Sequence, residues 1–180
     1  MNIKAIVVSS SLLLFSLSVL AASVVPDDML AAHNSYRAAV GSPGLRWSDS
    51  LEAKAKNLAN KLKLKGCSMS HSSTGENLYW ASAKMSATSK DASGNWVWEN
   101  TVQAVDDKKV TNSWADEKQW FDYNKNKCNA PAGKACGHYT QVVWKSTTEL
   151  GCGNAVCSDS SQVWVCNYAP AGNIVGEKPY

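Results

Sequence analysis

Two segments in the first third of the chain repeat hydrophobic positions at the spacing of an α-helix. The first opens at Pro26 and closes at Gly41, and its inward positions are Met29, Leu30, His33, Tyr36, Arg37 and Val40. In the second, Asp49 followed by Glu52 has the form of an N-cap with its returning carboxylate, ahead of Leu51, Ala55, Leu58, Ala59 and Leu62. The pattern therefore predicts two amphipathic helices.

The hydrophobic spacing changes in the rest of the chain. Residues 82–109 mix small and polar residues around isolated tryptophans, which indicates an irregular surface segment. Residues 110–123 form one helical stripe and predict a third helix. Short β-rich pieces predict strands at 76–81, 139–144, 150–154 and 163–168. Helices followed by a small, mostly antiparallel sheet predict an α+β fold with the sheet between helices.

The eight tryptophans divide between these patterns. Those in patterned segments are expected in the core, namely Trp47, Trp114, Trp144 and Trp164. The other four lie outside the patterned segments and are expected at exposed rims, namely Trp80, Trp96, Trp98 and Trp120.

The first 22 residues have the form of a signal peptide. Lys4 precedes an apolar stretch without acidic residues, and the small residues Ala21 and Ala22 suit cleavage. An uncleaved anchor is the alternative, but serines dilute the apolar stretch. We therefore expect residues 23–180 to form one secreted domain with no transmembrane anchor after cleavage. The destination is extracellular, or a periplasm if the source is bacterial.

Cysteine and charge narrow the class of protein further. All six cysteines follow the signal segment, and an even count in an exported chain indicates three disulfides, although sequence alone allows fifteen pairings. The 18 basic and 15 acidic residues give a net charge of +3. This charge is too small to indicate nucleic acid or an anionic membrane as a partner.

Four segments resemble the signature blocks of the CAP superfamily, which comprises cysteine-rich secretory, antigen 5 and pathogenesis-related class 1 proteins. The segments are His33-Asn34-Ser35-Tyr36-Arg37, residues 71–78 (HSSTGENL), residues 137–144 (GHYTQVVW) and Cys166-Asn167-Tyr168 with the tail to Tyr180. The resemblance implies a disulfide-stapled, three-layer α-β-α sandwich. It also implies the pairs Cys67–Cys157, Cys128–Cys136 and Cys152–Cys166. The segment from about Lys84 to Lys109 is longer than the plant class leads us to expect.

The resemblance also implies that His71, Glu76, Glu117 and His138 meet in one cleft. In the family, two histidines bind the metal and the glutamates hydrogen-bond around them. Two imidazoles and two carboxylates suit zinc, or magnesium with more water. The alternative is a polar cluster that holds a loop to a helix and binds metal weakly. His33 is expected to be a buried or capping residue that ties the first helix to the sheet.

Three functions remain open from the sequence. As a binding module, the protein would take a sterol or small lipid in a groove near Trp96 and Trp98, or would meet a protein receptor as a defence or host-interaction factor. As an enzyme, it would be a metal-assisted or serine-type hydrolase using the histidine cleft, with Ser72 or Ser73 beside His71. However, the common hydrolase motifs are missing from the sequence. As a precursor, it would release a signalling peptide starting at Pro170. We expect a binding module.

Overall fold

The structure is a computed structural model that describes residues 23–180, so the predicted signal peptide lies outside the described residues. In chain order the elements are α1 (Pro26–Ala38), β1 (Arg46–Trp47), α2 (Asp49–Lys63), β2 (Glu76–Ala81), β3 (Lys84–Lys90), β4 (Trp96–Thr101), α3 (Asp107–Ala115), the 3₁₀ helix η1 (Asp116–Trp120), β5 (Phe121–Asp122), β6 (Lys127–Cys128), α4 (Gly137–Val142), β7 (Glu149–Val156) and β8 (Gln162–Ala169). Within the described residues, no helix is both long and apolar enough to cross a membrane.

The central sheet has four strands in the order β1-β7-β8-β2. β1 runs parallel to β7, whereas β8 is antiparallel to both β7 and β2. Side chains of β8 alternate between the two faces of the sheet. Val163 and Val165 join the cluster formed with α2, and Trp164 and Tyr168 join the other cluster. Both faces of this strand are therefore buried, which explains its nearly continuous apolar sequence.

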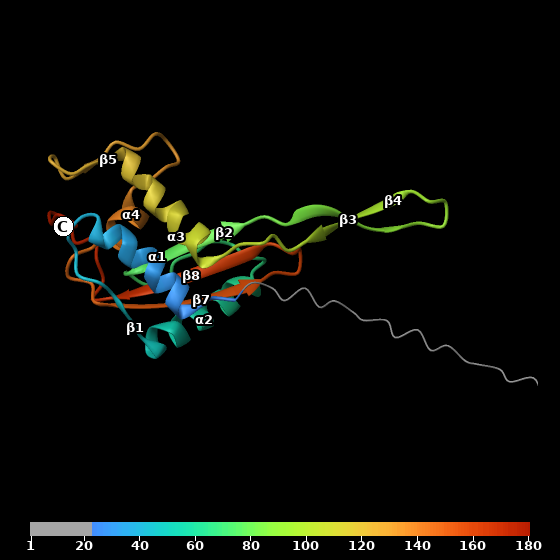
Figure 1. The fold of residues 1–180 in the computed structure, drawn as a ribbon, viewed down its shortest axis with the longest axis horizontal. Helices are drawn as coiled ribbons and strands as arrows, with labels where there is room; N and C mark the ends of the chain where they lie inside the picture. Colours follow the sequence, from blue (N-terminus) through green and yellow to red (C-terminus); the bar gives the residue numbers. More distant parts are fainter. Residues whose placement is uncertain (1–22) are drawn as a thin grey trace, which may run out of the picture.

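Helices cover both faces of the sheet and complete a three-layer α-β-α sandwich, as predicted (Figure 1). α2 packs on one face, while α1, α3 and α4 pack on the other. α2 approaches β7 closely because glycine occupies the contact. A Cβ atom at Gly151 would lie 2.2 Å from the backbone nitrogen of Glu52.

Three disulfides are present, in the pairing that the resemblance implied. Cys67–Cys157 links the turn after α2 to the end of β7, and Cys152–Cys166 crosses between β7 and β8. Cys128–Cys136 closes a short loop ahead of α4. The long bridge spans 90 residues, and the chain-entropy model gives such a loop roughly 4 kcal/mol of stabilisation.

The two predicted N-terminal helices are confirmed, but the predicted cap of α2 is wrong. Ser48 occupies the N-cap position and its side chain makes no capping bond. The Glu52 carboxylate accepts a hydrogen bond from Trp47 Nε1 at 2.8 Å and pairs with Lys56. The Glu52 carboxylate therefore orients the Trp47 side chain and does not cap the helix.

The third predicted helix begins earlier and ends sooner than its hydrophobic stripe suggests. Asp106 caps α3 by accepting a hydrogen bond from the backbone nitrogen of Lys109 at 2.7 Å. The chain then tightens into η1 and continues into β5. The segment from Val110 to Tyr123 therefore contains the end of an α-helix, a 3₁₀ helix and a short strand.

The predicted strand at 139–144 is wrong, because most of this segment is α4. A short apolar run does not distinguish a buried strand from a buried helix. The helical form buries Tyr139, Val142 and Val143, and lets Thr140 Oγ1 donate to the carbonyl of Cys136 at 3.1 Å. Tertiary burial therefore overrides the β propensity of this segment.

Residues 82–109 also differ from the prediction, because most of them form a two-stranded β-ribbon. β3 and β4 pair in antiparallel register and project from the body as an arm (Figure 1). The turn between them is organised by Asp91, whose Oδ1 accepts hydrogen bonds from the backbone of Ser93 and Asn95. This arm is named the β3–β4 ribbon below.

Most of the predicted placements of single residues are confirmed. Trp114, Trp144 and Trp164 are buried, and Trp47 is half-buried. His33 is completely buried and ties α1 to the sheet, since its Nε2 atom lies 2.9 Å from the Tyr168 hydroxyl of β8.

Candidate functional site

His71 lies in the loop before β2 and faces Glu76 at the start of that strand. Its Nδ1 atom is 3.6 Å from Glu76 Oε2, and its side chain is more than half exposed. The buried Glu76 carboxylate accepts hydrogen bonds from the backbone and hydroxyl groups of Ser72 and Ser73. Burial alone would raise the pKa of Glu76, but these bonds outweigh it and hold the pKa below its usual value. Glu76 is therefore a fixed carboxylate at neutral pH.

The two serines beside His71 do not have the geometry of an activated nucleophile. Ser72 Oγ and Ser73 Oγ donate to Glu76 Oε1, at 2.6 and 3.0 Å respectively. A nucleophilic serine needs a base, such as an imidazole, that accepts its hydroxyl hydrogen. Here the carboxylate accepts both hydrogens, so these contacts order the loop and do not support the serine-hydrolase hypothesis.

The second histidine is held by Glu117, which belongs to η1. His138 Nδ1 lies 2.7 Å from Glu117 Oε1, and Oε2 of the same carboxylate accepts the backbone N–H groups of His138 and Tyr139. The indole of Trp114 stacks on the imidazole at a centroid distance of 6.4 Å. His138 is therefore fixed in orientation at the first turn of α4.

One hydrogen bond connects the start of β2, where Glu76 lies, to the segment that holds His138. Asn77 follows Glu76 in the chain, and its Nδ2 atom donates to the carbonyl oxygen of His138 at 3.1 Å. In each pair Nδ1 faces a carboxylate, which leaves Nε2 available, and this arrangement is typical of metal-binding histidines. Within residues 23–180, however, no three His, Cys, Asp or Glu side chains gather as a ligand group for one metal ion. Any metal held here would have two imidazole ligands and complete its coordination with water.

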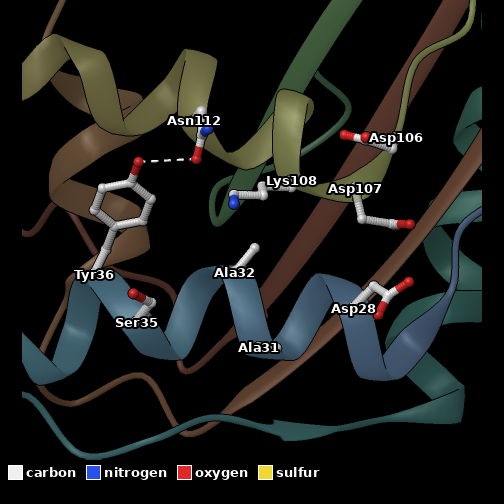
Figure 2. A pocket seen from close by; sticks show the side chains of 9 residues that line it. All are labelled: Asp28, Ala31, Ala32, Ser35, Tyr36, Asp106, Asp107, Lys108 and Asn112. Carbon is white, nitrogen blue, oxygen red and sulfur yellow. Dashed lines mark hydrogen bonds between the residues drawn. The ribbon is translucent and has the colours of Figure 1, made fainter.

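A separate cleft of about 530 Å³ lies between α1 and α3 (Figure 2). Ala31 and Ala32 line it on α1, and at one end Tyr36 OH donates to Asn112 Oδ1 at 2.9 Å. Three carboxylates and one ammonium group also line it, from Asp28, Asp106, Asp107 and Lys108.

The carboxylates give this cleft an acidic character. Burial raises the pKa of Asp107, and the nearby carboxylates of Asp28 and Asp106 raise it further. Both carboxylate oxygens of Asp107 accept the backbone N–H of Val25. An anionic ligand such as a fatty-acid carboxylate is therefore disfavoured at this end of the cleft.

The β3–β4 ribbon presents one apolar face to solvent. Trp96 and Trp98 are two residues apart on β4, and on β3 the face continues through Met85 and Ala87, the latter paired with Trp98. The exposed fractions of Met85, Trp96 and Trp98 are 56%, 58% and 59%. At the ribbon tip, Lys90 Nζ lies 4.9 Å from the Trp96 ring centroid. These residues form the apolar ribbon face discussed below.

The opposite face of the ribbon is mostly polar, although Val97 also lies on it, and it makes internal hydrogen bonds. Ser86 Oγ and Thr101 Oγ1 are 2.9 Å apart, and Thr88 Oγ1 donates to Glu99 Oε2 at 2.9 Å. The ribbon is therefore amphipathic, and its polar side chains satisfy one another across the two strands. Packing against the body does not explain the tryptophans on the other side, because they are exposed.

The C-terminal tail is anchored at both ends. Near its start, Thr147 Oγ1 donates to the carbonyl of Pro170 at 2.9 Å. Near its end, the backbone nitrogen of Lys145 donates to the carbonyl of Pro179 at 2.6 Å, and the ring of Tyr180 stacks on Tyr123 in the turn between β5 and β6. Residues 174–178 between them are exposed. A peptide cut before Pro170 would therefore still be held by these contacts, and nothing in them favours the precursor hypothesis.

Comparisons with known proteins show the family to which this chain belongs. The family model described as "CAP: Cysteine-rich secretory protein family" matches residues 30–168. Pathogenesis-related protein PRMS of Zea mays is 44% identical over 158 residues, which cover 86% of this chain and 82% of that protein. The chain therefore belongs to the cysteine-rich secretory protein (CAP) family.

Solved structures agree with this assignment. Venom allergen-like protein 4 of Schistosoma mansoni matches with a TM-score of 0.56 at 25% identity, covering 86% of this chain and 92% of that one. The crystal structure of NaASP2 with Zn²⁺ matches with a TM-score of 0.54 at 25% identity, covering 86% of this chain and 84% of that one.

Two features of the structure differ from what the sequence predicts or are absent from it: the β3–β4 ribbon and the cleft between α1 and α3. The turn residues Asp91 and Gly94, flanked by β-forming residues such as Val97, carried the signal of a hairpin, but the small and polar residues of β3 obscured it. The acidic cleft had no local signal. It exists only because α1 packs beside α3, which brings Asp28 next to Asp107 (Figure 2).

Proposed function

We propose that this protein is a secreted defence or host-interaction factor that binds a sterol on the apolar face of the β3–β4 ribbon. The class rests on its membership of the CAP family and on its similarity to plant pathogenesis-related proteins. Export is supported by the signal-like N-terminus and by three disulfides, which persist in oxidising compartments.

The observation that carries the ligand proposal is the exposure of two tryptophans and a methionine on one side of the ribbon. Along a strand, residues two apart are separated by about 7 Å, so the indoles of Trp96 and Trp98 can act on one ligand. Ala87 is small and lies opposite Trp98, which leaves room beside the indole. A flat, rigid and mostly apolar sterol suits such a surface better than a flexible anion does.

The energy required is modest. Micromolar affinity corresponds to about −8 kcal/mol, and burial of apolar surface contributes about 25 cal/mol per Å². A few hundred Å² of contact can therefore reach this affinity once ordering costs are deducted.

The proposal is tested by equilibrium binding of a fluorescent sterol to the secreted protein. Replacement of both Trp96 and Trp98 by alanine should weaken binding by at least about tenfold, since each lost indole removes more than 1 kcal/mol of apolar contact. Trp80→Ala is the matched control, because Trp80 is similarly exposed but belongs to β2. Unchanged binding in the double variant, an equal loss in Trp80→Ala, or no binding by the unaltered protein would disprove the proposal.

We further propose that His71 and His138 form a metal-competent site for zinc or magnesium. The donor chemistry fits, because each imidazole has Nδ1 turned to a carboxylate. A zinc-containing relative of the same fold adds support. When bound, the metal would act as a Lewis acid. Glu76 and Glu117 would orient the imidazoles that hold it.

Metal binding is measured directly by zinc titration followed by metal analysis. Substitution of both histidines by alanine should abolish binding, whereas Glu117→Gln should weaken it without abolishing it. Occupancy should fall on acidification, because a ligating imidazole must be neutral and protons compete for its lone pair. Sterol binding should survive in the histidine variants. Zinc retained by the double variant would refute the site.

A further inference from the structure

A line of lysines follows the solvent side of α2. Lys54 and Lys61 are seven residues apart, which places them on the same side of the helix, and Lys65 follows in the turn directly after α2. At 1.5 Å per residue, Lys54 and Lys61 are about 10 Å apart along the helix axis. All three side chains are exposed. This group is called the α2 lysine line.

Most of this positive charge is not neutralised within the described residues. Lys54 Nζ lies 3.9 Å from a carboxylate oxygen of Glu76, whereas Lys61 and Lys65 make no ion pair in residues 23–180. The acidic residues of α2 lie in its first turn, and one of them, Glu52, pairs with Lys56 on another side of the helix. The line is therefore available to an external anion.

A hollow of about 430 Å³ opens beside the first part of the line, between α2 and the loop before β2. Its polar lining consists of Ser50, Lys54, Asn57, Lys61 and Ser72. Lys54 is held in position there, since its ammonium group donates to Ser73 Oγ at 2.7 Å. The hollow thus combines two ammonium groups with hydroxyl and amide groups that can bind neutral hydroxyls.

The cleft in the opposite helical layer is acidic on balance. Three aspartates and one lysine line the cleft between α1 and α3, whereas two lysines and no carboxylate line the hollow on the α2 side. The net charge of +3 is small, but its uneven distribution directs anions to one side of the molecule.

We propose that the α2 lysine line and its hollow bind an anionic polysaccharide. Carboxylate or sulfate groups along the polysaccharide would pair with Lys54, Lys61 and Lys65, while sugar hydroxyls would bond to the serines and Asn57 of the hollow. A linear chain of charges matches a linear row of lysines. An anionic bilayer fits less well, because the apolar ribbon side chains lie on another element and the hollow is lined by groups that suit sugar hydroxyls. This site is distinct from the proposed sterol face.

The test is binding of the secreted, disulfide-bonded protein to polygalacturonate and to heparin, as carboxylated and sulfated probes. We expect binding to at least one probe at low salt, and weaker binding as salt rises. The triple variant K54Q/K61Q/K65Q should lose about tenfold or more in affinity. K127Q/K134Q/K145Q is the matched control, since it removes the same charge from exposed lysines outside the line.

The results separate this site from its alternatives. An unchanged affinity in the control, with sterol binding intact in both triple variants, supports a localised polysaccharide site. An equal loss of affinity in both triple variants would overturn the proposal, because binding would then depend only on the net charge of the protein. No binding to either polysaccharide would overturn the proposal. Binding to phosphatidylserine vesicles without binding to polysaccharide would also overturn it, because the partner would then be a membrane.

Discussion

The buried His33 predicts a specific acid sensitivity of folding. Its Nδ1 atom lies 2.8 Å from the carbonyl of Met29, which can only accept, so Nδ1 carries the proton and Nε2 accepts from Tyr168 OH. That hydroxyl also accepts a hydrogen bond from Asn77 Nδ2. A proton on Nε2 would break this chain of hydrogen bonds. Burial lowers the pKa of His33 to about 4, and the charge of Arg37 acts in the same direction.

The magnitude follows from the difference between the folded and unfolded pKa values. Above pH 6.5, His33 is neutral in both states and has no linkage effect. Between pH 6.5 and 4, His33 binds a proton in the unfolded chain but not in the folded protein. The free energy of unfolding therefore falls by about 3 kcal/mol as the pH drops over this range. Urea unfolding at a series of pH values from 7.5 to 4 measures this loss.

The matched variant is His33→Gln, which keeps a polar side chain but cannot titrate. It should be less stable than the unaltered protein at pH 7.5, because the hydrogen bonds are imperfectly replaced. Its loss of stability between pH 6.5 and 4 should be smaller by about 3 kcal/mol. Asp107, whose pKa burial raises, is present in both proteins, so its effect cancels in the comparison. Parallel pH profiles for the two proteins would refute this account of His33.

Two further predictions concern packing. Gly151→Ala should lower the free energy of unfolding by about 1–3 kcal/mol, because the new Cβ atom would collide with the backbone of α2; Gly44→Ala, where nothing lies closer than 3.6 Å, is the control. Arg37→Lys should cost roughly 2–4 kcal/mol in the same urea assay, since Arg37 donates to four carbonyl oxygens in a fork that lysine cannot reproduce. Stabilities equal to that of the unaltered protein would contradict either prediction.

The sequence predicted those parts of the fold whose signals are local. α1 and α2 have clear helical periodicity, and their buried residues are those that the pattern assigned inward, such as Met29 and Leu58. α4 was not predictable in this way. Its valines favour a strand locally, and only their burial against the rest of the core makes them helical.

The candidate site likewise has features that the sequence indicates and features that depend on the folded structure. The resemblance to the CAP superfamily pointed to His71, Glu76, Glu117 and His138 as one group without assigning partners. The structure pairs His71 with Glu76, and His138 with Glu117. The sequence of the ribbon predicts an irregular segment, because β3 is rich in small polar residues. The apolar face depends on the strand register, which places Ala87 opposite Trp98.

The most direct test of sterol binding is to locate the bound sterol by photo-crosslinking. A photoreactive sterol is incubated with the secreted protein, irradiated, and mapped by mass spectrometry of the digested chain. The account predicts labelled peptides from β3 and β4, at or beside Met85, Trp96 and Trp98, and a loss of label when excess unmodified sterol competes. Competable label confined to the cleft between α1 and α3 would contradict it.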